Sequence, residues 1–465
     1  MTDPARPSPW TRRALLAGGA AAAGGAALAA AWRLRPRPPN LVVLLTDDQG
    51  FNDLGCYYRP PPGQGPGPID TPRLDRMAAE GVRLTQFYDG AALCTPSRAA
   101  LLTGCYPPRV GFGAKDRGVG VLTPESRGGL AAEEVTLAEV LRSAGYATGC
   151  FGKWHLGHRP PFRPTQQGFD TYFGIPWSNN QVPLVLIRGE EVVRRADPRE
   201  PLTELFTREA LSFVSAHRHH PFFVYLAYSA PHEPLAVLPQ FRGRSPRGKY
   251  GDEIVEIDHF VGLLLDALAD HGLDEDTLVV FASDNGPWLD IPGDHGSAWP
   301  FRGGKGDPWE GGWRSPCLWR WPGTLAAGQV NDEVVTALDL LPTFARLAGA
   351  PLPAAPIDGH DVWPVLTAGA PSPTEAFAYY ARGRLEALRV GRYKRVFADP
   401  VRTPPTPPGL FDLEADPGET TDLSAAQPDE LARIDTVADG FRARLGDAIR
   451  GVTGSEQRPI GYFSG

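Results

Sequence analysis

Four continuous apolar segments without polar alternation lie at intervals along the chain. They cover residues 40–46, 146–151, 221–227 and 277–282. A run that is apolar at every position is typical of a strand buried on both faces of a parallel sheet. The sequence therefore predicts at least four central strands.

Segments with helical spacing of apolar residues lie between these strands, at 137–144, 202–217 and 252–271. In the last of them, Ile254, Ile257 and Val261 fall on one face, and Gly272 follows as a stop signal. Alternating strands and helices predict an α/β fold with a large, mostly parallel sheet sandwiched by helices.

The pattern changes after about residue 349. Short strands are predicted within 386–397 and 409–413, and a helix at 428–445. This arrangement predicts a smaller C-terminal α+β subdomain. The expected division of the chain is an export signal with a linker, a catalytic α/β domain and the C-terminal subdomain, at residues 1–39, 40–350 and 351–465.

Polar residues follow each predicted central strand. Because ligands of such folds bind outside the carboxyl ends of the strands, these residues indicate one polar site assembled from distant parts of the chain. They are Asp47, Asp48, Lys153, His155, His232, Asp284 and Asn285.

The N-terminal segment has the pattern of an export signal. Arg12 and Arg13 precede an Ala/Gly-rich stretch at 17–31, as in a twin-arginine signal. Export to the periplasm or the exterior of a bacterium is expected, and the alternative is an unstructured tail or a weak anchor. Alanine and glycine make a poor membrane span, so no stable span is expected. Whether the signal is cleaved stays open.

Composition excludes some classes of protein. The 465 residues are 42% hydrophobic and 22% charged, with a net charge of −8 and no long basic run. This argues against a nucleic-acid-binding protein, which carries a basic stripe, but not against a small anionic substrate. Five cysteines are an odd number, their pairing stays open, and their spacing matches no zinc motif.

The segment 94–104 carries the most chemical information. Pro96 suits the first turn of a helix over 97–102, and Gly104 suits its end. Cys94 is then at the helix N-terminus, which favours an anion. Arg98 is one turn along and can reach back towards it. The alternative for Cys94 is a buried small side chain or half of a disulfide.

The form Cys-x-Pro-x-Arg, followed by Ala-Ala-Leu-Leu-Thr-Gly, closely resembles the signature of the sulfatase family. The resemblance extends over residues 40–423 and includes 39–50, 152–157, 284–286, 303–306, 310–312 and 410–419. Within the family, residues 157–160, 168–170 and 174–178 are most similar to arylsulfatase A and N-acetylgalactosamine-6-sulfatase.

The resemblance implies that Cys94 is oxidised to formylglycine (3-oxoalanine) by a formylglycine-generating enzyme. It also implies one Ca²⁺ ion. From the residues alone, hard oxygen ligands suit Ca²⁺ or Mg²⁺ and not zinc, and the adjacent carboxylates of Asp47 and Asp48 repel each other unless a cation lies between them. The expected ligands are Asp47, Asp48, residue 94, Asp284 and Asn285.

The resemblance assigns the remaining roles. Arg98 orients the formylglycine, Lys153 and Lys305 hold sulfate oxygens, and Ser178 lies near the sulfate. His155 and His232 are the acid–base candidates. The implied reaction begins when one hydroxyl of the hydrated aldehyde attacks sulfur. The alcohol or phenol leaves with a proton from His232 or Lys305, and His155 helps to deprotonate the second hydroxyl, which expels sulfate.

Two alternatives remain open. One is a related hydrolase of phosphate or phosphonate esters, although such enzymes often hold two metals with extra His and Asp ligands. The other is a non-catalytic protein that binds a sulfated glycan. The substrate itself is not evident from the sequence, and loops 55–69, 111–129 and 179–195 with the C-terminal subdomain are expected to select it.

Overall fold

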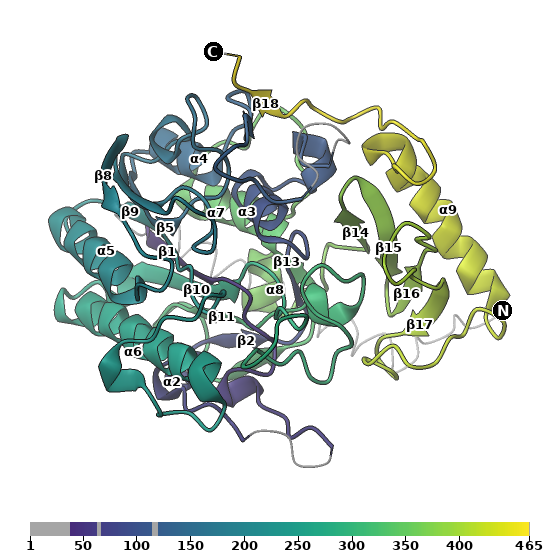
Figure 1. Cartoon of the computed structure of the whole chain (residues 1–465), viewed down its shortest axis with the longest axis horizontal. Coiled ribbons are helices and arrows are strands. Elements are labelled where there is room, and N and C mark those ends of the chain that lie inside the picture. Colours follow the sequence, from purple (N-terminus) through teal and green to yellow (C-terminus); the bar gives the residue numbers. More distant parts are fainter. Residues whose placement is uncertain (1–37, 63–66, 114–119, 465) are drawn as a thin grey trace, which may run out of the picture.

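The computed structural model describes residues 38–62, 67–113 and 120–464, and the predicted export signal lies almost entirely outside these ranges. A ten-stranded sheet forms the centre of the molecule (Figure 1), in the order β12-β2-β11-β10-β1-β9-β5-β6-β7-β8. Its strands are β1 (Asn40–Thr46), β2 (Val82–Leu84), β5 (Ala147–Lys153), β6 (Thr171–Ile175), β7 (Val185–Arg188), β8 (Glu191–Arg195), β9 (Phe222–Ala227), β10 (Thr277–Ser283), β11 (Cys317–Arg320) and β12 (Gln329–Asn331).

The middle of this sheet is parallel and its edges are mixed. Strands β10, β1, β9, β5 and β6 all run parallel, so the four apolar runs form adjacent strands as predicted. Antiparallel pairs join β10 to β11, β11 to β2, β6 to β7 and β7 to β8. Strand β5 continues two residues beyond the predicted end, so Lys153 is the last residue of a strand and does not lie in a loop.

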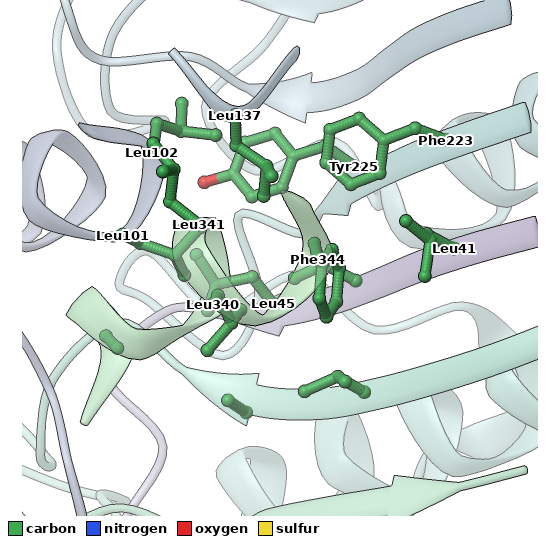
Figure 2. Packing of buried hydrophobic residues seen from close by; sticks show 14 of the residues in the cluster. Leu41, Leu45, Leu101, Leu102, Leu137, Phe223, Tyr225, Leu340, Leu341 and Phe344 are labelled. Atoms are coloured by element: carbon green, nitrogen blue, oxygen red, sulfur yellow. The ribbon is translucent and has the colours of Figure 1, made fainter. Parts of the chain in front are cut away.

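Helices cover both faces of the sheet. On one face Leu41 and Leu45 of β1 pack with α7 (Figure 2), and on the other face Val42 and Leu44 pack with the opposite helices. This explains why β1 is apolar at every position from Leu41 to Leu45. The first layer contains α3 (Cys94–Thr103), α4 (Leu137–Ser143), α7 (Leu340–Ala348) and α8 (Trp363–Ala368), and the second α2 (Pro72–Ala79), α5 (Thr203–His217) and α6 (Gly248–Asp270). No helix in the described ranges is long and apolar enough to cross a membrane.

A smaller antiparallel sheet lies towards the C-terminus, on the right of Figure 1. It contains β14 (Ala376–Ala381), β15 (Arg384–Val390), β16 (Tyr393–Val396) and β17 (Gly409–Asp412), and α9 (Pro428–Leu445) packs against it. Two-stranded pairs join β3 (Phe87–Tyr88) to β13 (Val335–Thr336) and β4 (Gly128–Gly129) to β18 (Gly461–Tyr462). The predicted C-terminal α+β subdomain is confirmed.

A buried ion pair ties the C-terminal sheet to the segment between β10 and β11. The carboxylate of Glu310 accepts hydrogen bonds from Lys394 Nζ (2.9 Å), Tyr379 OH (2.6 Å) and Tyr88 OH (2.6 Å). Burial would raise the pKa of Glu310, but the charges of Lys394, Arg314 and Arg389 lower it to about 2. Glu310 is therefore ionised at neutral pH, and side chains of β3 and of the C-terminal sheet both donate hydrogen bonds to it.

Glu310→Gln is expected to destabilise the fold strongly, because it leaves the buried Lys394 ammonium with Glu419 as its one remaining ion-pair partner. Breaking a buried pair costs about 3–5 kcal/mol. Urea unfolding of wild type and variant measures this loss. Glu414→Gln, which changes an exposed glutamate paired with Arg392, is the control and should unfold like wild type. An equal midpoint for Glu310→Gln and wild type would contradict the prediction.

Candidate active site

The structure brings the polar strand ends together at one edge of the parallel sheet. Asp47 and Asp48 follow β1, and Asp284 and Asn285 follow β10. Backbone hydrogen bonds hold these segments in register, from Asp284 N to Thr46 O (3.0 Å) and from Asp47 N to Ala230 O (3.2 Å). The expected convergence of distant segments is therefore present.

Cys94 is the first residue of α3, three residues before the predicted start of that helix. No side chain caps this N-terminus, and the Cys94 side chain is buried and lines a cavity. All five cysteines have free thiols, so Cys94 is not half of a disulfide. Burial raises the pKa of the Cys94 thiol, although Lys153 and Lys305 oppose this. An unmodified Cys94 is thus a neutral thiol and a weak nucleophile.

Arg98 is fully buried and links the ends of β5 and β10 through hydrogen bonds. Its Nε and Nη2 donate to Asp284 Oδ2 at 2.9 and 2.7 Å, and its Nη1 donates to the carbonyl oxygen of Lys153 at 2.9 Å. The Nη2 atom also lies 3.2 Å from Asp47 Oδ2. Arg98 was predicted to reach back towards Cys94, and the two side chains are close enough to interact electrostatically. The hydrogen bonds of Arg98 are made with Asp284 and Lys153 instead.

The acidic residues form a compact donor set. Ligand atoms of Asp47, Cys94 and Asp284 lie within 4.8 Å of one another, and so do those of Asp47, Asp48 and His232. Within the part of the chain that the structure describes, the buried atoms Asp47 Oδ1 and Asn285 Oδ1 have no hydrogen-bond partner. Buried oxygens are rarely left without a partner, so these two atoms indicate a cation-binding position.

Backbone strain and perturbed pKa values mark the same cluster. Asp48 has a φ of 65°, in the left-handed region that non-glycine residues rarely adopt. Burial would raise the pKa of Asp47, but Lys153, His232 and Arg98 bring it well below the usual range. Burial and the nearby Asp47 charge raise the pKa of Asp284 to about 6. A divalent cation would keep both carboxylates ionised.

Two lysines contact this acidic set, one at Asp47 and the other at Asp48. Lys153 Nζ contacts Asp47 Oδ2 and lies 3.2 Å from Ser178 Oγ. Lys305 Nζ is 2.7 Å from Asp48 Oδ1, and its charge is retained because Asp48 and Asp47 raise its pKa despite burial. Both side chains are almost fully buried, which fits the deep positions expected from their glycine- and aromatic-rich surroundings.

Both histidines are neutral, because burial and neighbouring positive charges lower their pKa values. Burial and nearby lysines lower the pKa of His155 far below its usual range, and they lower that of His232 to about 4. His155 Nε2 is 2.8 Å from the carbonyl oxygen of Leu122, while its Nδ1 has no partner. Donation by Nε2–H leaves Nδ1 as a free proton acceptor. His232 Nε2 lies 3.6 Å from Asp48 Oδ2.

A cavity of about 600 Å³ opens above this cluster. Its base contains Cys94, His155, Ser178, His232 and Lys305, all expected from the sequence. Lys153 is fully buried and is not among the residues that line the cavity, but its Nζ lies 3.2 Å from Ser178 Oγ, which does line it. The chemistry available there is anion binding by Lys305 beside a metal-type oxygen cluster and Cys94.

Comparison with known proteins agrees with this geometry. The family profile described as Sulfatase matches residues 39–350. The chain belongs to the sulfatase family. It is a sulfuric ester hydrolase, as the resemblance implied.

Two curated relatives of this sulfatase are named for that activity. Arylsulfatase A of Homo sapiens is 40% identical over 452 residues, covering 86% of each chain. N-acetylgalactosamine-6-sulfatase of Mus musculus is 42% identical over 381 residues, covering 77% of this chain and 72% of the relative. The predicted likeness to these two groups is confirmed.

Solved structures of sulfatases share the whole fold. The PsFucS1 sulfatase from Pseudoalteromonas sp. superposes with a TM-score of 0.78 at 28% identity, covering 99% of this chain and 97% of that one. Ps i-CgsB in complex with k-i-k-neocarrahexaose has a TM-score of 0.76 at 28% identity and covers 92% of this chain and 95% of that one.

The sequence did not predict several of the residues that line the cavity of this sulfatase. Loop 111–129 contributes Val121 and loop 179–195 contributes Asn180 and Gln181, as expected for selecting loops, whereas loop 55–69 contributes none of its described residues. The C-terminal sheet region contributes a group that no motif marks. It consists of Arg382, Arg384, Val401, Arg402 and Thr403.

Proposed function

We propose that this sulfatase hydrolyses aryl or carbohydrate sulfate monoesters to an alcohol or phenol and inorganic sulfate, using formylglycine made from Cys94 and one Ca²⁺ ion. The main support is the buried set of oxygen donors beside Cys94, which Lys153 and Lys305 contact, with Lys305 also lining the cavity. The named substrates of the relatives, aryl and amino-sugar sulfates, agree with it.

The donor set fits calcium. Asp47, Asp48, Asp284 and Asn285 offer carboxylate and amide oxygens, and two of these oxygens lack any hydrogen bond. Calcium prefers such ligands. When bound there, it would supply positive charge to a sulfate oxygen and to the oxygen of residue 94.

The protein side chains bind the substrate and move protons. Lys153, Ser178 and Lys305 can hold sulfate oxygens, and Arg98 fixes the carboxylates that surround residue 94. Lys305, which is charged, can protonate the departing oxygen, whereas His232 is neutral and would first have to take up a proton. The free Nδ1 of His155 can accept a proton from a hydroxyl of residue 94.

The decisive experiment is the mass of the tryptic peptide 84–98 from protein made together with a formylglycine-generating enzyme. We expect residue 94 to have lost sulfur and two hydrogens and gained one oxygen. Paired assays with an aryl sulfate and the matching aryl phosphate then separate sulfatase from phosphatase activity. An unmodified Cys94 in catalytically active protein, or a preference for the phosphate, would overturn the proposal.

Two further parts of the proposal concern maturation and location. Arg12 and Arg13 support export by the twin-arginine route to the periplasm or the exterior. That route carries folded proteins, so Cys94 would be modified before export. Arg12→Lys together with Arg13→Lys should leave the protein in the cytoplasm, as cell fractionation would detect.

A further inference from the structure

One side of the cavity is basic and belongs to the C-terminal sheet. Arg382 lies in the turn of the hairpin formed by β14 and β15, Arg384 is the first residue of β15, and Arg402 lies in the segment before β17. All three line the same cavity as Cys94 and Lys305. The substrate outside the sulfate-binding base therefore faces this arginine group.

Two of these arginines are already neutralised. Arg384 pairs with Asp399 at 2.8 Å and with Glu386 at 3.0 Å. Arg402 pairs with Asp307 at 2.9 Å and donates to the carbonyl oxygen of Gly306 at 2.7 Å. The guanidinium groups of Arg384 and Arg402 are held by partners within the cavity wall, so few of their N–H donors remain for a ligand.

Arg382 differs from both. Its side chain is exposed to the cavity, and within residues 38–62, 67–113 and 120–464 no carboxylate pairs with it and no group accepts a hydrogen bond from it. It is thus the wall arginine whose donors are available to a ligand. An arginine presents a planar fork of donors that suits a carboxylate or a sulfate group.

The backbone at Arg382 is unfavourable for arginine. Arg382 and Gly383 form the two-residue turn between paired residues Ala381 and Arg384, with φ values of 51° and 73°. A turn with two positive φ values favours asparagine followed by glycine. Strain of this kind at a cavity suggests a functional constraint on the side chain.

The turn is also held rigidly. A Cβ atom on Gly383 would lie 2.0 Å from the carbonyl oxygen of Gly113, and Gly383 O accepts a hydrogen bond from Ala448 N at 2.8 Å. The hairpin tip is therefore fixed between two other segments. A side chain on such a support has a defined place in the cavity wall.

We propose that Arg382 forms a subsite for a second anionic group of the substrate, so that the preferred substrates are sulfate esters carrying a further carboxylate or sulfate on the alcohol side. This proposal rests on the proposed function. It assigns substrate selection to a turn of the C-terminal sheet, remote in sequence from every residue of the sulfate-binding base.

The test compares kcat/KM for three substrates: a monosulfated neutral disaccharide, its uronate-containing counterpart and its disulfated counterpart. Arg382→Asn suits the turn and removes the charge. We expect it to lower kcat/KM by about 10- to 100-fold for the anionic substrates, the loss of a charged hydrogen bond, and by less than about 2-fold for the neutral one. Arg382→Lys should retain part of the preference.

Arg199→Asn is the matched control, because Arg199 is exposed and does not line the cavity. It should leave all three values unchanged. The two anionic arms show whether carboxylate or sulfate is the preferred second group. Equal effects of Arg382→Asn on neutral and anionic substrates would overturn the subsite. Failure of wild type, with residue 94 fully modified, to hydrolyse any of the three or an aryl sulfate would instead overturn the proposed function.

Discussion

Cys94→Ser is expected to lower steady-state turnover of sulfate esters by at least about 10⁴-fold, as removal of a nucleophile does in other hydrolases. A serine hydroxyl at this position can attack sulfur, but it lacks the second hydroxyl needed to expel sulfate. The variant should therefore react once and keep a sulfate ester on residue 94. Intact mass after incubation with substrate measures this directly, as the mass of one SO₃ group added.

Cys94→Ala is the comparison variant, because alanine has no hydroxyl that could attack sulfur. It can bind the substrate but should gain no mass. Cys56→Ser is the matched control, since Cys56 is a free thiol that does not line the cavity, and it should remain active. All three variants should unfold near the wild-type temperature. Multiple turnover by Cys94→Ala at the wild-type rate would refute the assignment of residue 94 as nucleophile.

The central fold could be predicted because burial on both faces leaves a clear pattern. Residues 41–45 are apolar at every position and form most of the strand between β9 and β10. The edge strand β8 lacked such a pattern, because Glu191 to Arg195 are all exposed. Helix α6 begins one turn earlier than expected, at Gly248, since polar Lys249 there gave no apolar periodicity.

The base of the site could be predicted for a different reason. Its residues follow strands, and parallel strands end at one edge, so Asp47, Lys153 and Asp284 had to lie close together. The C-terminal subdomain was expected to help select the substrate, but the individual residues of the cavity wall could not be predicted. Arg382 comes from a turn whose place over the cavity depends on how the C-terminal sheet packs, and a single arginine in a hairpin has no local signal that distinguishes it from a solvated charge.

Asp47→Asn is the second change expected to have a very large effect. The carboxylate of Asp47 contacts the buried cations Lys153 and Arg98, and its Oδ1 atom has no hydrogen-bond partner and is free to bind a cation. Asparagine keeps the shape but removes the charge. We expect kcat/KM to fall by about 10³-fold, because the proposed cation loses an anionic ligand and Lys153 loses its ion-pair partner.

Calcium titration followed by thermal unfolding separates the metal effect from a general loss of stability. Wild type should unfold at a higher temperature with calcium than with a chelator. Asp47→Asn should lose most of this difference, while Asp197→Asn, a change at an exposed carboxylate that does not line the cavity, should keep it. A normal calcium response in inactive Asp47→Asn would remove Asp47 from the metal site and leave it the role of orienting Lys153. The same response with normal activity would refute both roles.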